Sequence, residues 1–376
     1  MLKSRFRKIS AYALGAAALM SLSSQAQALT FVLTFTTGTS AQAQAGFQAA
    51  ADRWSSIFSD NATINLTVGT AALGAGILGR AGSVQTRYSY AAFKTALLGD
   101  ITSASDATAV ANLDPGNSFG MMINRTSDNP NGSGSATPYL DLAGANNETI
   151  RLTNANAKAL GLTPTLGTNS LCVGNCDAGI QFSSNFAFDY DPSDGITAGQ
   201  FDFIGIAMHE IGHALGFVSG VDILDGNSPP VRGPFAANDF TFVSSLDLFR
   251  YSALSASQPG GVIDWTADTR AKCFSIDGGT TLGACFSTGP NFGDGQQASH
   301  WKDSLGLGIM DPTAGAGELL SVSANDRMAF DVIGWNLAVA APAVPEPGTW
   351  MMMLAGFGLV GGAVRRRRTT QIAALA

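Results

Sequence analysis

The segment 201–217 (FDFIGIAMHEIGHALGF) constrains this chain most, because it holds two of the only three histidines. Its apolar and small residues predict a closely packed helix that ends at Gly216, since glycine tolerates the left-handed conformation that ends helices. His209 and His213 are four residues apart, so they project from one face of that helix and can reach one ion. A fold built around this helix must bring a further ligand to it from elsewhere.

Glu210 lies next to His209, where its carboxylate can hold a water on the metal without joining the ligands. Zinc lowers the pKa of such a water towards ~7, and the carboxylate can take its proton as it attacks a carbonyl. The H-E-x-x-H pattern is short and arises by chance in many proteins. Its helical context and its use of two of three histidines favour a catalytic zinc site over two ordinary core histidines.

A catalytic zinc site needs three protein ligands and one open position. An extended form of the motif would carry its third histidine at position 219, but the residue there is Ser219, a poor zinc ligand. The remaining histidine is His300, which we expect to be the third ligand. The alternatives are the two carboxylates nearest the end of the helix, Asp222 and Asp225, of which Asp222 could reach back if the turn after Gly216 is tight.

Two further features follow His300. Residues 308–313 (GIMDPT) are typical of a tight turn that places Met310 beneath a zinc ion, and residues 323–337 suit a closing helix that packs on this turn. Together with the histidine helix, this order resembles leishmanolysin-type metzincins and their bacterial relatives. In that family a long insertion, a Ser-His pair, a Met-turn with proline and a closing helix follow the histidine helix.

The resemblance covers residues 201–217 and 299–337. It implies that one catalytic Zn²⁺ is bound by His209, His213 and His300. It also implies that Glu210 is the general base and that Met310 is the Met-turn residue. The implied activity is that of an endopeptidase acting on extracellular proteins, with protein or peptide substrates. The alternative is a non-catalytic surface or matrix-binding protein that keeps a metal site for structure.

The resemblance also implies a two-lobed α+β fold, like that of metzincins, over residues 29–340, with the cleft between residues 29–217 and 218–340. In the first lobe, patterning predicts a mixed sheet with helices: strands at 30–36, 63–68, 121–124 and 148–153, an edge strand at 179–183, and helices at 41–58, 90–98 and 154–162. Residues 219–299 are rich in Gly, Pro, Asp and Ser, which predicts a mostly irregular second lobe.

Residues 1–28 read as a cleaved signal peptide. A basic start precedes the apolar run 11–22, which is shorter than the roughly 20 residues that span a bilayer. Ala26 and Ala28 then form the small-residue pattern that signal peptidase recognises, so we expect Leu29 to be the first mature residue.

Residues 344–376 combine a Pro-Glu-Pro motif, an uncharged and largely apolar run at 350–364, and four arginines, Arg365 to Arg368. This tail resembles the PEP-CTERM sorting signal of Gram-negative bacteria. The resemblance implies an exosortase partner, transient anchoring through a transmembrane segment in the tail, and delivery to the cell surface or extracellular matrix. A plain C-terminal membrane anchor is the alternative.

An exported chain with four cysteines favours two disulfides over reactive thiols. Three pairings are possible, and the local ones, Cys172 with Cys176 and Cys273 with Cys285, are the simplest. A zinc site made of all four cysteines is disfavoured, because the spacings lack the usual C-x₂-C knuckles.

Charge excludes one class of partner. The formal net charge is −7, and eight of the 21 basic residues lie at the two ends, so the body is strongly acidic and has no route to nucleic acids. Within the body, Asp189, Asp191 and Asp194 suggest a calcium site. The EF-hand pattern fails at Gln200, and a solvated turn is favoured.

Overall fold

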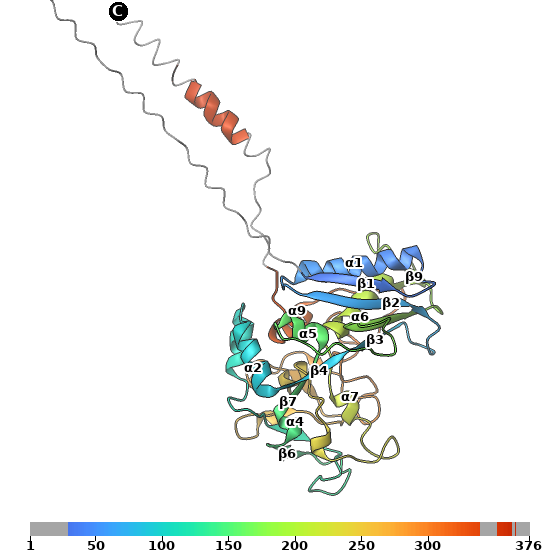
Figure 1. Ribbon diagram of the computed structural model, residues 1–376, viewed down its shortest axis with the longest axis vertical. Helices are drawn as coiled ribbons and strands as arrows, with labels where there is room; N and C mark the ends of the chain where they lie inside the picture. The colour runs from blue at the N-terminus through green and yellow to red at the C-terminus, as the bar shows by residue number, and fades with distance from the viewer. Residues whose placement is uncertain (1–28, 339–351, 363–364, 366–376) are drawn as a thin grey trace, which may run out of the picture. The chain divides into compact units, whose positions relative to one another are not determined.

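The computed structural model describes residues 29–338, 352–362 and 365 (Figure 1). The chain separates into two compact units, Met1–Asn336 and Leu337–Ala376. The expected signal peptide and most of the sorting tail lie outside the described residues. Of the tail, residues 352–362 form a helix. Within the described ranges, no helix combines the length and apolarity needed to cross a bilayer.

A four-stranded sheet underlies the first half of the chain, in the order β1 (Thr30–Phe35), β2 (Thr63–Ala71), β8 (Ala178–Ser183) and β3 (Gly79–Ser83). β1, β2 and β8 are parallel, whereas β3 runs antiparallel to β8. The prediction of an edge strand at 179–183 is therefore wrong, because β8 pairs on both sides. The edge is β3, whose sequence GRAGS carries no apolar alternation by which it could be recognised.

Two helices pack together beside this sheet, α1 (Ala41–Ile57) and α6 (Phe203–Leu215) (Figure 1). They approach closely at Gly46, where an added Cβ would lie 2.4 Å from the Phe203 ring. The Trp54 indole of α1 donates a hydrogen bond of 2.9 Å to the backbone of α6. The histidine helix is thus fixed by a hydrogen bond as well as by apolar packing.

α6 ends at Gly216 as predicted, but it begins only at Phe203, because residues 201 and 202 form β10. The Asp202 carboxylate accepts a hydrogen bond from the Gly205 N–H and caps the first turn, satisfying one of the unpaired N–H groups found there. At the other end Gly216 adopts φ 123°, a conformation that favours glycine. These two ends fix which residues of the motif are helical.

The rest of the first half contains small elements. Antiparallel β4 (Gln85–Ser89) and β7 (Thr149–Thr153) form one ribbon, and β12 (Ile263–Asp264), β5 (Met121–Ile123) and β6 (Tyr139–Asp141) form a three-stranded sheet. The others are α2 (Tyr90–Gly99), α3 (Ala104–Ala111), α4 (Ala145–Glu148), α5 (Asn154–Ala159), β9 (Phe188–Asp189) and β10 (Phe201–Asp202). Since β12 pairs with β5, the two halves of the chain share a sheet and belong to one compact unit.

Short elements make up residues 219–299, none longer than four residues. They are α7 (Val221–Leu224), η1 (Ala237–Asp239), η2 (Leu246–Phe249), β11 (Arg250–Tyr251), α8 (Ala253–Ala256), β12, β13 (Lys272–Phe274) and β14 (Cys285–Phe286). The closing helix α9 (Ala324–Val332) begins after the capping residue Ser323 and is shorter than the predicted 323–337.

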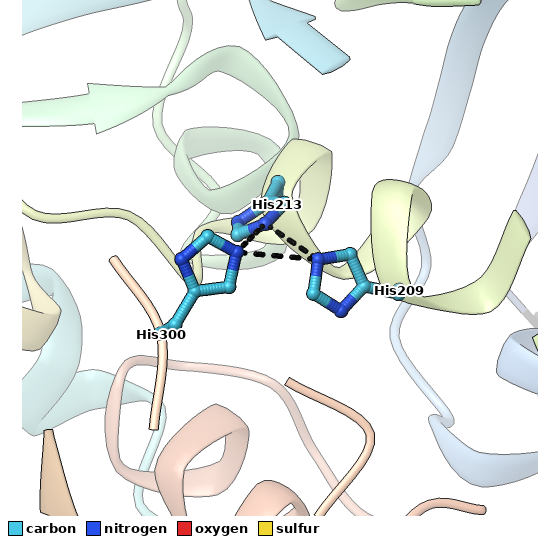
Figure 2. Close-up of side chains that lie close together, drawn as sticks. All are labelled: His209, His213 and His300. Atoms are coloured by element: carbon cyan, nitrogen blue, oxygen red, sulfur yellow. Dashed lines mark hydrogen bonds between the residues drawn. The ribbon is translucent and has the colours of Figure 1, made fainter. Parts of the chain in front are cut away.

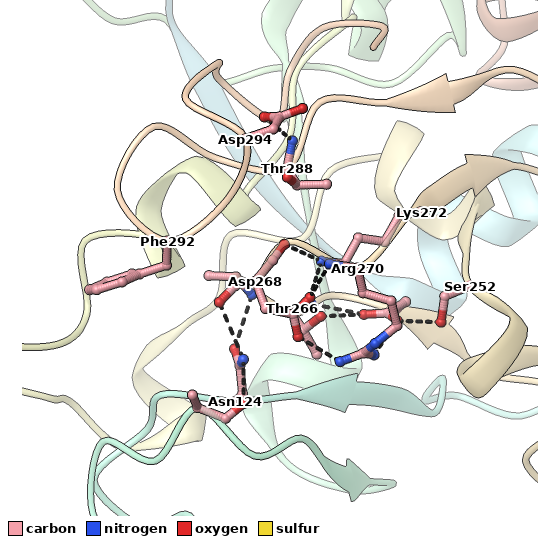
Figure 3. A network of polar contacts seen from close by, with 12 residues as sticks. Asn124, Ser252, Thr266, Asp268, Arg270, Lys272, Thr288, Phe292 and Asp294 are labelled. Atoms are coloured by element: carbon pink, nitrogen blue, oxygen red, sulfur yellow. Dashed lines mark hydrogen bonds and ion pairs between the residues drawn. The ribbon is translucent and has the colours of Figure 1, made fainter.

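A network of charged side chains supports this irregular half (Figure 3). Arg270 and Lys272 both converge on Asp268, at 2.5 and 2.6 Å, and Arg270 also contacts Asp264 at 2.8 Å. The Lys272 and Asp264 side chains are fully buried, and burial lowers the pKa of Lys272 while the two carboxylates oppose that change. Buried charges are tolerated only when paired, and here both buried charges have partners of opposite sign.

Both local disulfides are present, Cys172–Cys176 and Cys273–Cys285, and no described cysteine is free, which confirms the predicted oxidised state. The first closes the loop before β8. The second joins directly opposed residues of β13 and β14.

Candidate metal centre

Three histidines from two distant segments meet in the first compact unit. His209 and His213 extend from α6, and His300 reaches them from a loop segment (Figure 2). The Nε2 atoms lie 3.0 Å apart for His209 and His213, 3.1 Å for His213 and His300, and 3.3 Å for His209 and His300. Within residues 29–338 and the described part of the tail, this is the only group of three or more potential ligands close enough to share an ion.

The other nitrogen of each ring faces a backbone carbonyl. Nδ1 of His209 lies 2.8 Å from the Ile309 oxygen, Nδ1 of His213 lies 2.7 Å from that of Phe217, and Nδ1 of His300 lies 3.2 Å from that of Gln297. A carbonyl only accepts, so each Nδ1 carries the proton and donates it. Each neutral ring therefore presents the bare lone pair of Nε2 to the other two.

Removal from water keeps the rings neutral. It lowers the pKa of all three imidazoles, that of His213 to about 3 and that of His300 well below its usual value, and each ring disfavours charge on its neighbours. No proton then remains to link the three Nε2 atoms. Lone pairs this close repel one another unless a cation lies between them.

The spacing and chemistry of the donors fit zinc. A tetrahedral ion with Zn–N bonds of 2.0–2.1 Å separates its ligand nitrogens by about 3.3 Å, close to the three separations found here. Imidazole ligands suit zinc better than the harder calcium or magnesium. With three nitrogens and no fourth protein ligand among the described residues of the group, one coordination position would stay open.

Glu210 lies outside the ligand group and beside the cleft. It is 5% exposed, and burial raises its pKa to about 8. Its carboxylate is close to β3, where a Cβ added to Gly79 would lie 2.8 Å from Oε1. Glycine at this position leaves room for the carboxylate, a role that sequence reasoning missed because nothing in GRAGS signals contact with a helix far along the chain.

The segment that carries His300 lies along β14 like a further strand. The Ser287 N–H donates to the His300 carbonyl at 3.0 Å, and the Lys302 N–H donates to the Cys285 carbonyl at 2.8 Å. Trp301 forms a β-bridge with Phe286 and is fully buried, so it is a packing residue rather than a substrate platform.

Met310 packs against the underside of the histidine helix. Its sulfur lies 2.5 Å from where a Cβ on Gly212 would be, so only glycine permits the contact. Asp326, at the start of α9, accepts hydrogen bonds from the Ile309 N–H and the Trp301 indole, both at 2.8 Å. One carboxylate thereby joins the turn, the His300 segment and the closing helix.

The group includes neither Ser219 nor the alternative ligands Asp222 and Asp225. The Ser219 hydroxyl donates to Asp247 at 2.6 Å. Both oxygens of Asp222 accept hydrogen bonds from Ala298 and Ser299, next to His300. Asp222 therefore contacts the segment of the third histidine and not its ring.

The histidines open onto a cleft of about 760 Å³. Its walls come from β3, α6, α7 and the segments 296–300 and 311–314. Both halves of the chain contribute to it, and the exposed apolar side chains Ile77 and Ile223 lie on its lining.

The carboxylates of the acidic loop, Asp189 and Asp191, accept hydrogen bonds from residues of the same turn. Asp189 accepts hydrogen bonds from the Thr197 hydroxyl and N–H, and Asp191 accepts one from the Ser193 N–H. These bonds, chiefly those from the Thr197 and Ser193 side chains, lower the pKa of both carboxyls. In the described residues the loop brings no three ligand atoms together, and calcium binding stays a prediction.

Residues 343–368 match the family of the PEP-CTERM protein-sorting motif. The motif supports an exported protein with surface or membrane-associated sorting in bacteria, and it implies processing by an exosortase. Comparisons with curated proteins and with solved structures give no match. The resemblance to leishmanolysin-type metzincins therefore stays a prediction.

Proposed function

We propose that this chain is an exported zinc-dependent endopeptidase that hydrolyses peptide bonds in extracellular proteins. The observation that carries the proposal is the convergence of three unprotonated Nε2 atoms beside the Glu210 carboxylate in an open cleft. The sorting motif at 343–368 supports the extracellular setting.

When bound, zinc acts as a Lewis acid towards a peptide carbonyl and lowers the pKa of a bound water. The three histidines hold and orient the ion, because their Nδ1–H bonds to backbone carbonyls fix the rings. Glu210 takes a proton from the attacking water and hands it to the nitrogen of the leaving amine. A cation near Glu210 favours its charged form and so opposes the effect of burial on its pKa.

The edge strand β3 offers a site where an extended peptide could bind. β3 is the edge of the four-stranded sheet, it lines the cleft, and it has no strand partner on its outer side among the described elements. Exposed strand edges bind extended peptides through main-chain hydrogen bonds. A peptide lying along β3 would pass beside Glu210, since Gly79 of this strand adjoins its carboxylate.

The rival is a surface or matrix-binding protein that uses the metal only for structure. Glu210 argues against it, because a structural site has no use for a buried carboxylate that has no protein hydrogen bond in the described part of the chain. Burying such a group costs free energy, which a catalytic role would explain.

Digestion of casein tests the proposal. Wild-type protein should cleave it, lose the activity with a chelator and regain it with added zinc. His209→Ala, purified in parallel, should cleave nothing and reveals any contaminating protease. Cleavage that is unaffected by chelation would contradict a zinc-dependent mechanism. No cleavage of casein or a peptide library by zinc-loaded protein would favour the rival.

A further inference from the structure

Asp222 links the two parts of the chain that carry the histidines. It lies on α7, which follows the histidine helix almost directly. Its Oδ1 accepts a hydrogen bond of 2.6 Å from the Ala298 N–H, and its Oδ2 accepts bonds from the Ser299 hydroxyl at 2.7 Å and the Ser299 N–H at 3.3 Å. Both oxygens are thus directed at the two residues before His300.

The same segment is held from the opposite side. The guanidinium of Arg250, which is 1% exposed, donates through Nη2 to the Ala298 carbonyl and through Nη1 to the Ser287 carbonyl at 3.2 Å. Ser287 in turn donates its N–H to the His300 carbonyl. The backbone of the segment is therefore fixed by hydrogen bonds on both sides of Ala298.

We propose that Asp222 is a positioning residue that sets the position of the His300 ring relative to α6 and so determines how tightly the site binds zinc. The inference rests on the proposed zinc site and deepens it. His209 and His213 share one rigid helix, whereas His300 arrives on a separate loop segment. A short path through α7 ties that loop to the same helix, in addition to the contacts of the Met310 turn with α6.

The expected effect is on metal affinity. Groups that orient metal ligands from outside the ligand set typically contribute 10–100-fold to affinity, because a misplaced ligand must be moved before it binds. Asp222→Asn keeps an oxygen for the Ala298 N–H but loses the acceptor for Ser299. We expect zinc to dissociate at about 10–100-fold lower concentration of competing chelator than from wild-type protein.

Asp225 provides a matched control. It lies at the end of the same short helix, is fully buried, and accepts backbone bonds from Asn291 at 2.6 Å and Phe292 at 2.9 Å. The loop that it holds carries no histidine. Asp225→Asn should therefore cost at least as much unfolding free energy as Asp222→Asn and leave zinc affinity within about threefold, because its hydrogen bonds go to Asn291 and Phe292 and not to the residues next to His300.

The experiment is competition for zinc between a chromophoric chelator and wild-type, Asp222→Asn, Asp225→Asn and Ser299→Ala proteins, with unfolding of each metal-free protein measured in parallel. Ser299→Ala removes only the hydroxyl bond and should weaken binding about 2–10-fold even if Asp222→Asn does not fold. Equal zinc affinity of wild type, Asp222→Asn and Ser299→Ala, or an equal loss of affinity in Asp225→Asn, would overturn the inference. Wild-type protein that binds no zinc would instead overturn the proposed site.

Discussion

At the scale of single residues, the proposed site gives Glu210 and the histidines separate tasks. The histidines would present neutral nitrogens to an ion, while Glu210 stays outside the group and faces the cleft. We predict that Glu210→Gln binds zinc like wild type but cleaves protein about 10²–10⁴-fold more slowly, since an amide cannot accept the proton of the attacking water.

The measurement is kcat/KM for a peptide substrate, with zinc content and unfolding as controls for an intact site. If this variant cleaves as fast as wild type, Glu210 is not the base.

The chemistry-bearing residues could be read from the sequence because helical spacing alone brings His209 and His213 together. The third zinc ligand, His300, could be predicted only by elimination and from the family resemblance. Gly79 could not be found, and Asp222 was considered only as a ligand, since their contacts with Glu210 and Ser299 join residues that are far apart in the chain. No local pattern records such contacts.

At the scale of elements, the pairing of β13 with β14 supports the His300 segment, and Cys273–Cys285 joins the two strands. We predict that replacing both of these cysteines by serine lowers zinc retention and activity. The matched control replaces Cys172 and Cys176, which close the loop before β8 and do not belong to the β13–β14 pair.

Removing a disulfide costs about 2–5 kcal/mol in small secreted domains, so both double variants should unfold more easily than wild type. Only the variant that lacks Cys273 and Cys285 should release zinc faster to a chelator. Equal zinc release from the two variants would show that the strand pair does not hold His300 in place.

Alkylation of the folded wild-type protein without reductant should label no cysteine.

Elements with strong periodicity were predictable, including α1, β1, β2 and α6, because their buried faces appear directly in the residue spacing. β3 was missed because glycine-rich strands lack that signal. α3 was missed although Ser103 and Asp106 form a capping box, since its Ala- and Thr-rich sequence shows no apolar stripe. β8 was placed at an edge because strand order depends on partners that the sequence does not name.

At the scale of the whole molecule, carboxyls gather where the first compact unit ends, around Asn336. Asp60 and Asp100 both accept hydrogen bonds from the Asn336 side chain. Burial raises the pKa of Asp60 to about 7 and that of Asp100 to about 6. Between pH 4 and 7 the folded state therefore binds more protons here than the unfolded state, and this contribution to stability falls as pH rises.

We predict that the free energy of unfolding falls less between pH 5 and pH 8 in Asp60→Asn than in wild type. The difference should be about 1–3 kcal/mol. Denaturant unfolding of both metal-free proteins at the two pH values measures this. The histidines titrate with the opposite sign in both proteins, so their contribution cancels in the comparison. Asp52→Asn, at an exposed position on α1, is the control, and an equal pH dependence of Asp60→Asn and wild type would contradict the prediction.

The two ends of the chain allow a prediction about the exported form. The signal-peptidase pattern and the sorting motif predict a protein that begins at Leu29 and lacks Arg365 to Arg368. Intact-mass measurement on protein from the native host tests it. A mass that includes the whole tail would contradict processing by an exosortase.

The central claim is an open zinc site made by His209, His213 and His300. X-ray absorption at the zinc edge of the loaded protein tests it most directly. We expect one zinc per chain with three imidazole nitrogens at about 2.0–2.1 Å and one further light atom, and loss of this signal in His300→Ala. Sulfur ligands, or an unchanged spectrum and full zinc content in His300→Ala, would contradict it.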